Sequence, residues 1–371
     1  MIPPYVRQVA DAVLWEGYVL YPYRASSGKN EVRFQFGVVM PPGQGESSHQ
    51  QSEVLLDGDP ATVQVHVRFL HLQHRMPDDW DEAVEQVWER PFKVGQERVR
   101  CEPWEASEGE VHRTRWPVLA TLGMALRPAG PGWILTVRVE NDSPTWPGQT
   151  RRSALRQALV GCHLVLTVPT GRFVSILEPP PEWADHAAQC RQEYTFPVLV
   201  GDDRAVLASP IILYDHPKVA PQSPVAYHDG TEIDEMLTLR VMTLTDAEKQ
   251  EALATDERCR SIVEAAGRAD AETLERLHGG MVWLDGPAPE TRSVVVDGVT
   301  VAAGTRVRLR PKRNADAMDM FLAGREAEVV GVFQDVEGLE YVAVSTGDDW
   351  HGRPYFFYLD EIELMEGSIS T

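Results

Sequence analysis

Short runs of alternating apolar and polar residues dominate the first two thirds of the chain. In residues 62–72 every second position is apolar, which is typical of a strand with one buried face: Val63, Val65, Val67 and Phe69. The apolar phase then changes to Leu70 and Leu72, which predicts a bulge or the end of the strand. Residues 119–126 and 133–139 flank the turn segment RPAGPG and predict a hairpin, because its Pro and Gly residues cannot continue a strand.

Other segments of this region predict further short strands and a few helices. The strands are expected at residues 32–40, 163–168, 172–177, 196–200 and 205–214. A helix is expected over residues 79–90, because acids in its first turn suit the helix dipole, and shorter helices over 151–159 and 182–191. Many short strands separated by Pro and Gly indicate a sandwich or an irregular β assembly, without the strand–helix alternation of a nucleotide-binding sheet.

The pattern becomes helical near residue 231. Thr245 and Glu248 form a capping box, which predicts the start of a short helix. Further helices are expected over three segments: 232–241, 256–266 and 271–278. The last of these ends at a Gly–Gly pair, and the segment GPAPET, residues 286–291, then predicts a linker.

Strands return from residue 293 onward, in five segments: SVVVDGVTV, TRVRLRP, EAEVVGVFQD, EYVAVST and YFFYLDEIEL. So many short strands in one small region favour an SH3-like barrel. The expected fold class is therefore mainly β (α+β), in three parts. These are a β-rich body over residues 1–243, a helical connector and linker over 244–290, and an SH3-like small β-barrel over 291–371.

The chain has 371 residues and a net charge of −21, from 35 Lys and Arg against 56 Asp and Glu. This acidic balance disfavours broad nucleic-acid binding and an anionic membrane surface, because both require clustered cations. It suits a well-solvated protein, or one that selects a basic protein partner. The first residues lack the features of a secretory signal, and no apolar run is long enough to span a bilayer, so we expect a cytoplasmic protein.

Cysteine spacing and catalytic motifs exclude several classes of site. The four cysteines are far apart and form no CxxC pair: Cys101, Cys162, Cys190 and Cys259. Structural zinc usually draws on short spacings, so reduced and mostly buried thiols are expected instead. The sequence also lacks a GxSxG elbow and a GxGxxG motif after a strand, which disfavours a hydrolase and a nicotinamide or flavin enzyme.

The densest group of metal-ligand side chains lies between residues 214 and 235. Imidazole and carboxylate groups together hold transition metals, which makes four residues candidate ligands: Asp215, His216, His228 and Glu232. No two histidines there have the i, i+4 spacing of a helical zinc site. The alternative is structural, with Asp215 and His216 ending a strand and the HDGTE segment capping a helix.

A second candidate is the loop YPYRASSGKN, residues 21–30. Its small residues allow backbone amides to approach an anion, and its side chains supply donors and charge: Arg24, Ser26, Ser27 and Lys29. The segment lacks the GxxxxGK[ST] spacing of a phosphate loop. An ordinary polar turn is the alternative.

The third candidate is the stretch TRVRLRPKR, which has five cations and no acid: Arg306, Arg308, Arg310, Lys312 and Arg313. On a strand, these residues would form a charged edge that binds a partner beside exposed aromatic side chains such as Trp350. From residue 293 to the end, seven cationic side chains face fourteen acidic ones, which disfavours RNA or DNA. Docking within the chain, or onto an acidic protein partner, is the remaining expectation.

Three stretches carry a resemblance to a known family: EGYVLYPYRASSGKNEVRFQFGVV, SPIILYDHPKVAPQSP with TEIDEMLTLRVMTLTDAEK, and RVRLRPKRNADAMDMFLAGREAEV. Together they resemble a bacterial family associated with gene clusters for nickel–iron uptake hydrogenases. The resemblance implies an accessory protein for maturation, assembly or cofactor handling of the hydrogenase. Hydrogenase subunits or a maturation factor would then be the protein partner.

The sequence thus favours a non-enzymatic accessory or scaffold protein that binds another protein and carries no cofactor. The first alternative is a protein that handles nickel or iron, with Asp215, His216, His228 and Glu232 as ligands and a transition metal as cofactor. The second is an enzyme with an unfamiliar site. No membrane insertion is expected in any of these cases.

Overall fold

The computed structural model describes residues 2–219, 225–230, 232–269, 273, 277, 293–296, 298–312, 322–334, 340–346 and 355–365. Within these ranges the protein is mainly β, with several antiparallel sheets. The chain forms two compact units, Met1–Gly280 and Met281–Thr371.

One sheet of the first unit has the antiparallel order β10-β1-β8-β7-β4. Its strands are β1 (His49–Asp57), β4 (Gly95–Cys101), β7 (Val118–Ala129), β8 (Gly132–Asn141) and β10 (Arg172–Val174). The strands β7 and β8 pair from Ala129 opposite Gly132 to Ala120 opposite Asn141, which confirms the predicted hairpin.

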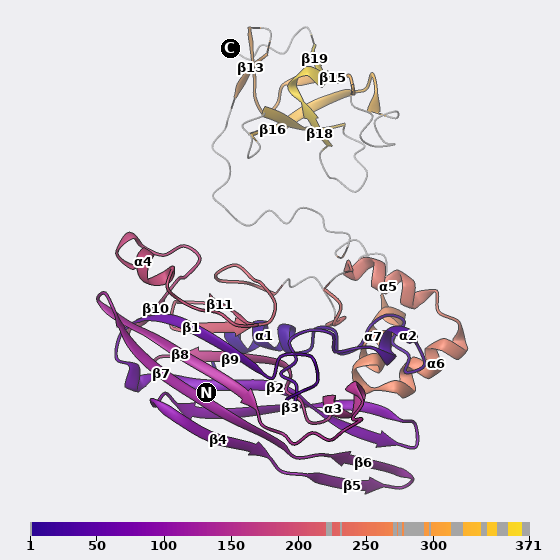
Figure 1. Cartoon of the computed structure of the whole chain (residues 1–371). Helices are drawn as coiled ribbons and strands as arrows, with labels where there is room; N and C mark the ends of the chain where they lie inside the picture. The colour runs from indigo at the N-terminus through magenta and orange to yellow at the C-terminus, as the bar shows by residue number, and fades with distance from the viewer. Residues whose placement is uncertain are drawn as a thin grey trace. The chain divides into compact units, whose positions relative to one another are not determined.

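The second sheet of this unit has the order β11-β12-β9-β2-β6-β5, and β3 pairs along the other edge of β2. Its strands are β2 (Gln64–Met76), β3 (Trp80–Pro91), β5 (Trp104–Glu108), β6 (Val111–Arg115), β9 (Val160–Thr167), β11 (Phe196–Leu199) and β12 (Ala205–Ser209). Figure 1 shows the two sheets as stacked layers. A single core of buried side chains fills the space between them, so this part is a β-sandwich.

The helix predicted over residues 79–90 is wrong, because this segment is strand β3. It pairs with β2 over its whole length, from Trp80 opposite Arg75 to Pro91 opposite Gln64. The backbone hydrogen bonds and the packing of Trp88 into the sandwich core outweigh the favourable effect of acids in a first helical turn. The strand predicted over residues 32–40 is also absent, apart from one isolated bridge at Val39.

The predicted bulge in β2 is confirmed, because the register against β9 shifts between Arg68 and Leu70. The strand continues beyond this point to Met76. Before the bulge, alternate apolar residues such as Phe69 face the sandwich core. Leu70 and Leu72 lie in a second core, which the helices build on the opposite face of the sheet. The change of apolar phase therefore marks a strand that is buried on both faces.

The helices of the first unit are α1 (Pro4–Leu14), α2 (Gly28–Glu31), α3 (Arg151–Leu155), α4 (Ala184–Ala187), α5 (Asp234–Met242), α6 (Asp246–Thr255) and α7 (Glu257–Arg268), with single 3₁₀ turns at Pro60–Thr62 and Pro181–Trp183. Helix α1 packs its valines on the outer face of the second sheet. The predicted capping box at Thr245 and Glu248 is present and begins α6. Helices α5, α6 and α7 group with α2 at one end of the sheets (Figure 1) and share the second core. Residues 244–269 of the predicted connector thus pack within the first unit.

The second unit has a hairpin of β13 (Val294–Val296) and β14 (Val299–Val301), and a sheet of order β18-β17-β16-β15-β19. The sheet strands are β15 (Arg306–Leu309), β16 (Glu326–Gln334), β17 (Glu340–Ser345), β18 (Tyr355–Tyr358) and β19 (Ile362–Leu364), with a 3₁₀ turn at Leu359–Glu361. These elements surround a core of their own. No closed barrel forms within the described part of this unit. The predicted linker at 286–291 lies outside the described residues, as does most of the predicted helix at 271–278.

All four cysteines are free thiols, as predicted, and three of them are buried: Cys101, Cys162 and Cys259. Within the described ranges, no helix has both the length and the apolar character needed to cross a bilayer.

Candidate functional site

The four predicted metal ligands are held by separate structural contacts. The Oδ1 atom of Asp215 accepts a hydrogen bond from the backbone N–H of Leu199 at 2.7 Å, and its Oδ2 accepts one from the Ser175 hydroxyl at 2.5 Å. The backbone N–H of His216 donates to the carbonyl of the same residue, Leu199, at 2.7 Å. Asp215 and His216 therefore fasten the chain beside strand β11. They do not end a strand, as the structural alternative predicted, because β12 already ends at Ser209.

His228 and Glu232 have other partners. The backbone carbonyl of His228 accepts from Gly17 at 2.7 Å, and its ring lies 6.5 Å from that of Trp15. Burial lowers the pKa of His228 to about 3, and the positive charge of Arg258 adds to the shift. Glu232 forms an ion pair with Arg240 at 2.9 Å. Across the part of the chain that the structure describes, no three His, Cys, Asp or Glu side chains form a metal-binding group. These four side chains are thus not gathered into such a group, and a metal site at these positions stays a prediction.

The donors of the predicted anion loop bind carboxylates and backbone of their own chain. The Ser27 hydroxyl caps α2 by accepting from the N–H of Asn30. Arg24 lies 3.3 Å from Glu248 and 3.6 Å from Glu251, and the backbone N–H of Ser26 donates to Glu251 at 3.1 Å. Arg24 and Ser26 are thus bound to helix α6, whereas Ser27 caps α2 and Lys29 lies within α2. The loop is fixed to that helix and forms one wall of a cavity.

The basic stretch forms strand β15, and its burial alternates as predicted. Arg308 pairs with Glu326 of β16 at 3.2 Å, Arg310 with Glu363 of β19 at 2.9 Å, and Lys312 with Asp360 at 3.5 Å. Acids on neighbouring elements thus neutralise much of this charge within the unit. Arg306 lies at the start of the strand and is exposed. The predicted partner-binding residues Arg313 and Trp350 lie outside the described residues.

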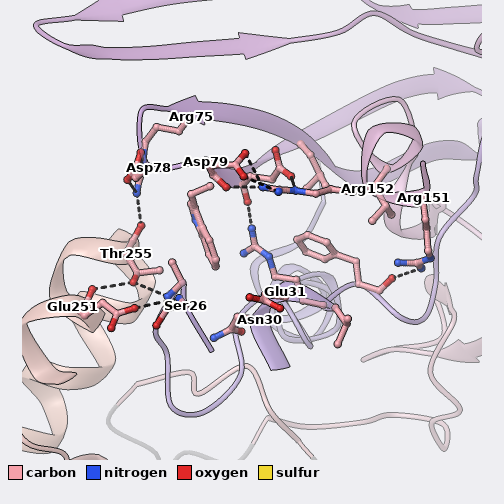
Figure 2. A pocket seen from close by; sticks show the side chains of 18 of the residues that line it. Ser26, Asn30, Glu31, Arg75, Asp78, Asp79, Arg151, Arg152, Glu251 and Thr255 are labelled. Atoms are coloured by element: carbon pink, nitrogen blue, oxygen red, sulfur yellow. Dashed lines mark hydrogen bonds and ion pairs between the residues drawn. The ribbon is translucent and has the colours of Figure 1, made fainter. Parts of the chain in front are cut away.

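The sequence did not predict a cavity of about 850 Å³ in the first unit. Four segments that are distant in sequence surround it: residues 25–35, the β2–β3 turn, α3 and the end of α6. Figure 2 shows Ser26 beside Glu251 and Thr255 on one side, Arg75 with Asp78 above them, and Arg152 with Asp79 across the cavity. The loop and the hairpin are each joined directly to α6, because the backbone N–H of Ser26 donates to Glu251 at 3.1 Å and Arg75 Nη2 donates to the carbonyl of Thr255 at 2.8 Å.

The rim of the cavity is a frame of ion pairs. Arg75 contacts Asp78 through Nε at 2.9 Å and Glu82 through Nη1 at 2.6 Å. Arg152 contacts Asp79 at 2.8 Å. Hydrogen bonds from these two guanidinium groups hold the pKa of Asp78 and of Asp79 below the usual value. The carboxylates are therefore ionised and weakly basic near neutral pH.

A buried carboxylate, Asp81, connects this frame to α3. It accepts from Arg156 Nε at 2.9 Å and from Arg152 Nε at 3.3 Å, and it lies 3.0 Å from Nδ1 of His74. Because Arg152 also contacts Asp79, the two arginines of this corner are balanced by two carboxylates. The geometry fixes the position of α3 relative to the β2–β3 turn and hence the width of the cavity.

Arg33 and Trp80 form the inner wall. The Arg33 guanidinium stacks 3.5 Å from the centre of the Trp80 ring, and the rings of Phe34 and Tyr18 lie at 4.7 and 5.3 Å. Its Nη1 donates to the carbonyl of Tyr18 at 3.2 Å, and its Nη2 to that of Asp81. Burial lowers the pKa of Arg33, although nearby acidic groups oppose that shift. A cation so enclosed by aromatic rings is pre-organised, because its side chain has no freedom left to lose on binding.

Sequence reasoning missed this site because its residues come together only through tertiary contacts. The available signals were Arg33 within the apolar run VRFQFGVV and the group of acids around Trp80. We interpreted the first as a strand and the second as the first turn of a helix. Both segments are instead walls of one cavity.

No model of a known protein family matches the chain. The search of curated proteins finds no match either.

Proposed function

We propose that this protein is a non-enzymatic accessory or scaffold protein, and that the cavity at Arg33 receives part of a protein partner. The main support for this proposal is that the acidic side chains of the rim form ion pairs with arginines. Asp78 and Asp79 are held by arginines that lower their pKa, which makes them poor general bases. Fixed ion pairs around a mouth lined by aromatic and apolar side chains suit recognition, where pre-organised groups bind without rearranging.

The identity of the partner is a further part of the proposal. The sequence resembles a family associated with nickel–iron uptake hydrogenases, so hydrogenase subunits and their maturation factors are the partners we favour. An acidic chain with net charge −21 suits association with a partner that presents a basic surface around the inserted segment. Ser26 and the rim arginines then orient that segment.

Quantitative affinity capture from the native host tests the proposal. The tagged protein is compared with Arg152→Ala, whose side chain is half exposed and whose loss leaves Asp81 paired with Arg156. A partner that uses the cavity should be recovered at least about threefold less with this variant, because it removes an arginine of the rim and leaves Asp79 without its cation.

Arg172→Ala is the matched control. It removes an exposed arginine that pairs with Asp57 at 3.3 Å, and neither residue lines the cavity. The control should recover the partner as well as the unaltered protein does. Equal recovery with all three proteins would show that the cavity takes no part in binding, and the absence of any enriched protein would contradict the accessory role itself.

We also propose that the second unit has an SH3-like fold. Its strands β15 to β18 follow one another as a meander, and β19 returns to pair with β15. A 3₁₀ turn separates β18 from β19. This order and this turn are typical of SH3-like barrels. Backbone NMR of the full chain tests the proposal through contacts between the ends of β18 and β19, the two edge strands of the sheet. A flat sheet without contacts between these ends would refute an SH3-like fold.

A further inference from the structure

The indole N–H of Trp80 is a buried donor without an acceptor. Trp80 is 4% exposed and lines the cavity. Its Nε1 atom has no hydrogen-bond partner among the residues that the structure describes. Buried tryptophans usually satisfy this donor, because an unpaired buried N–H is unfavourable. An unsatisfied donor in the wall of a cavity indicates that an acceptor belongs there.

Arg33, which stacks on the same ring, is a buried cation without a directly bonded acid. Within the described residues, its two hydrogen bonds go to the backbone carbonyls of Tyr18 and Asp81. Throughout the described ranges, no carboxylate oxygen lies within 4.0 Å of an Arg33 nitrogen. A guanidinium carries five N–H donors, so donors remain for a further acceptor. The other arginines of the lining each pair with a carboxylate: Arg75, Arg151 and Arg152.

The charge of the lining selects a singly charged anion. Four arginines and five acids line the cavity, and the acids are Glu31, Asp78, Asp79, Asp81 and Glu251. A multiply charged group such as phosphate would face this acidic surplus, since like charges in a confined site repel each other strongly. A carboxylate brings one negative charge to the one guanidinium that lacks a bonded acid. It is also planar, which matches the fork of guanidinium donors.

The rest of the wall suits an apolar stem attached to that group. Aliphatic and aromatic side chains lie between the charged residues: Val32, Phe34, Leu72, Leu155 and Ala254. The volume of about 850 Å³ accommodates several residues of an inserted chain or one small molecule.

We propose that the cavity is a carboxylate-binding site, in which the Trp80 indole N–H and the Arg33 guanidinium donate to one carboxylate on an apolar stem. The inference rests on the proposed function where the carboxylate belongs to a partner, as a chain terminus or an acidic side chain. The same chemistry is offered by a small free acid. In either case the ligand supplies the acceptor for Trp80 and the counter-charge for Arg33.

NMR of the indole N–H groups of the intact chain tests this proposal. Trp80→Phe keeps an aromatic ring under Arg33 and identifies the Trp80 signal by its loss. The probes are sodium valerate, neutral valeramide of the same shape, inorganic phosphate, and an acetylated Ala-Gly hexapeptide with a free or an amidated carboxyl end. We expect valerate and the free-acid peptide to move the Trp80 proton downfield saturably. Valeramide, phosphate and the amidated peptide should leave it in place.

Calorimetric titration of the same probes measures affinity without relying on one resonance. Arg33→Gln and Trp80→Phe should each weaken valerate binding at least about tenfold, because each removes a donor to a charged acceptor. Trp80→Phe keeps most of the packed ring, so it remains informative if Arg33→Gln fails to fold. The inference is overturned if valerate and the free-acid peptide both fail to bind, if their neutral analogues bind equally well, or if phosphate binds as tightly.

These outcomes separate the inference from the proposed function. Binding of valerate but not of the free-acid peptide supports the carboxylate site and counts against insertion of a partner chain. The opposite combination of results is also informative. If Arg152→Ala loses a captured partner but no carboxylate moves the Trp80 signal, the accessory role is supported and the carboxylate site is overturned.

Discussion

Three buried histidines should make this protein sensitive to mild acid. Burial lowers the pKa of His163 and of His228 to about 3, and that of His71 to about 4, from an ordinary value of 6.5. The unfolded chain binds these protons more readily than the folded one. The contribution of the three neutral histidines to the free energy of unfolding is therefore fully present above the ordinary pKa. It is lost as the pH falls below about 6.5, and the loss from each group levels off near its folded pKa.

The size of the effect follows from these values. Between about pH 7.5 and about pH 5, each histidine protonates in the unfolded state and stays neutral in the folded state, which removes about 2 kcal/mol. Together the three remove about 6 kcal/mol, a large share of the 5–15 kcal/mol that typically stabilises a domain. Urea unfolding of the intact chain, followed by circular dichroism at several pH values, measures the free energy of unfolding directly.

A variant assigns the effect to a single side chain. His163 is fully buried and its Nδ1 lies 3.1 Å from the carbonyl of Gly161, a contact that an asparagine amide can replace. His163→Asn should reduce the loss of stability between the two pH values by about 2 kcal/mol, whatever it does to stability at neutral pH. His112→Asn, at an exposed position on β6, is the matched control and should leave the loss unchanged. If the free energy of unfolding falls equally in His163→Asn and in the unaltered protein between the two pH values, the buried imidazole does not resist protonation and the reasoning fails.

Three further predictions concern packing and reactivity. A Cβ at Gly132 would lie 2.1 Å from the carbonyl oxygen of Leu56. Gly132→Ala should therefore destabilise the first unit by about 3 kcal/mol or more in urea unfolding. Gly123→Ala should be nearly neutral, because the nearest atom to its Cβ would lie 3.8 Å away. Thr245→Ala removes the hydroxyl that accepts from the N–H of Glu248, while the backbone N–H of residue 245 can still donate to the Glu248 side chain. This change should cost about 1 kcal/mol in the same assay, and an unchanged free energy of unfolding would contradict the cap. Cys162 and Cys259 should resist a thiol reagent until the protein unfolds, since burial raises the pKa of both, and labelling of the native protein at either position would refute their burial.

Local patterns predicted the elements whose stability depends on neighbours in sequence. The β7–β8 hairpin followed from a turn segment between two apolar runs, and the cap of α6 from the spacing of Thr245 and Glu248. Strand β3 was missed because its acids and alanine allow a helix, and only pairing with β2 decides the outcome. The signal in favour of a strand was the spacing of Trp80 and Trp88, which are both buried.

The cavity lay beyond such reasoning for a different reason. Arg33, Trp80, Leu155 and Thr255 come from four segments, and no pattern within any one of them indicates the others. The sequence instead drew attention to His216 and His228, which lie close in sequence and have separate partners in the fold. Proximity along the chain is a weak guide to a site, because ligands converge through sheet register and helix packing rather than through spacing alone.

The basic strand β15 shows how the same limit applies to charge. A run of cations without acids looks unbalanced in the sequence, but antiparallel pairing places Arg308 opposite Glu326 on one side and opposite Glu363 on the other. Such exposed pairs add little stability, since each is screened by water and salt. They do remove the local excess of positive charge that an acidic partner would recognise. Arg33 in the cavity is the reverse case. Nothing in the sequence marks it as unusual, but in the fold it is buried and its hydrogen bonds go to backbone carbonyls. The field of a buried cation is screened less than that of an exposed one, so we expect the single arginine, rather than the run of five, to contribute more to binding at the proposed site.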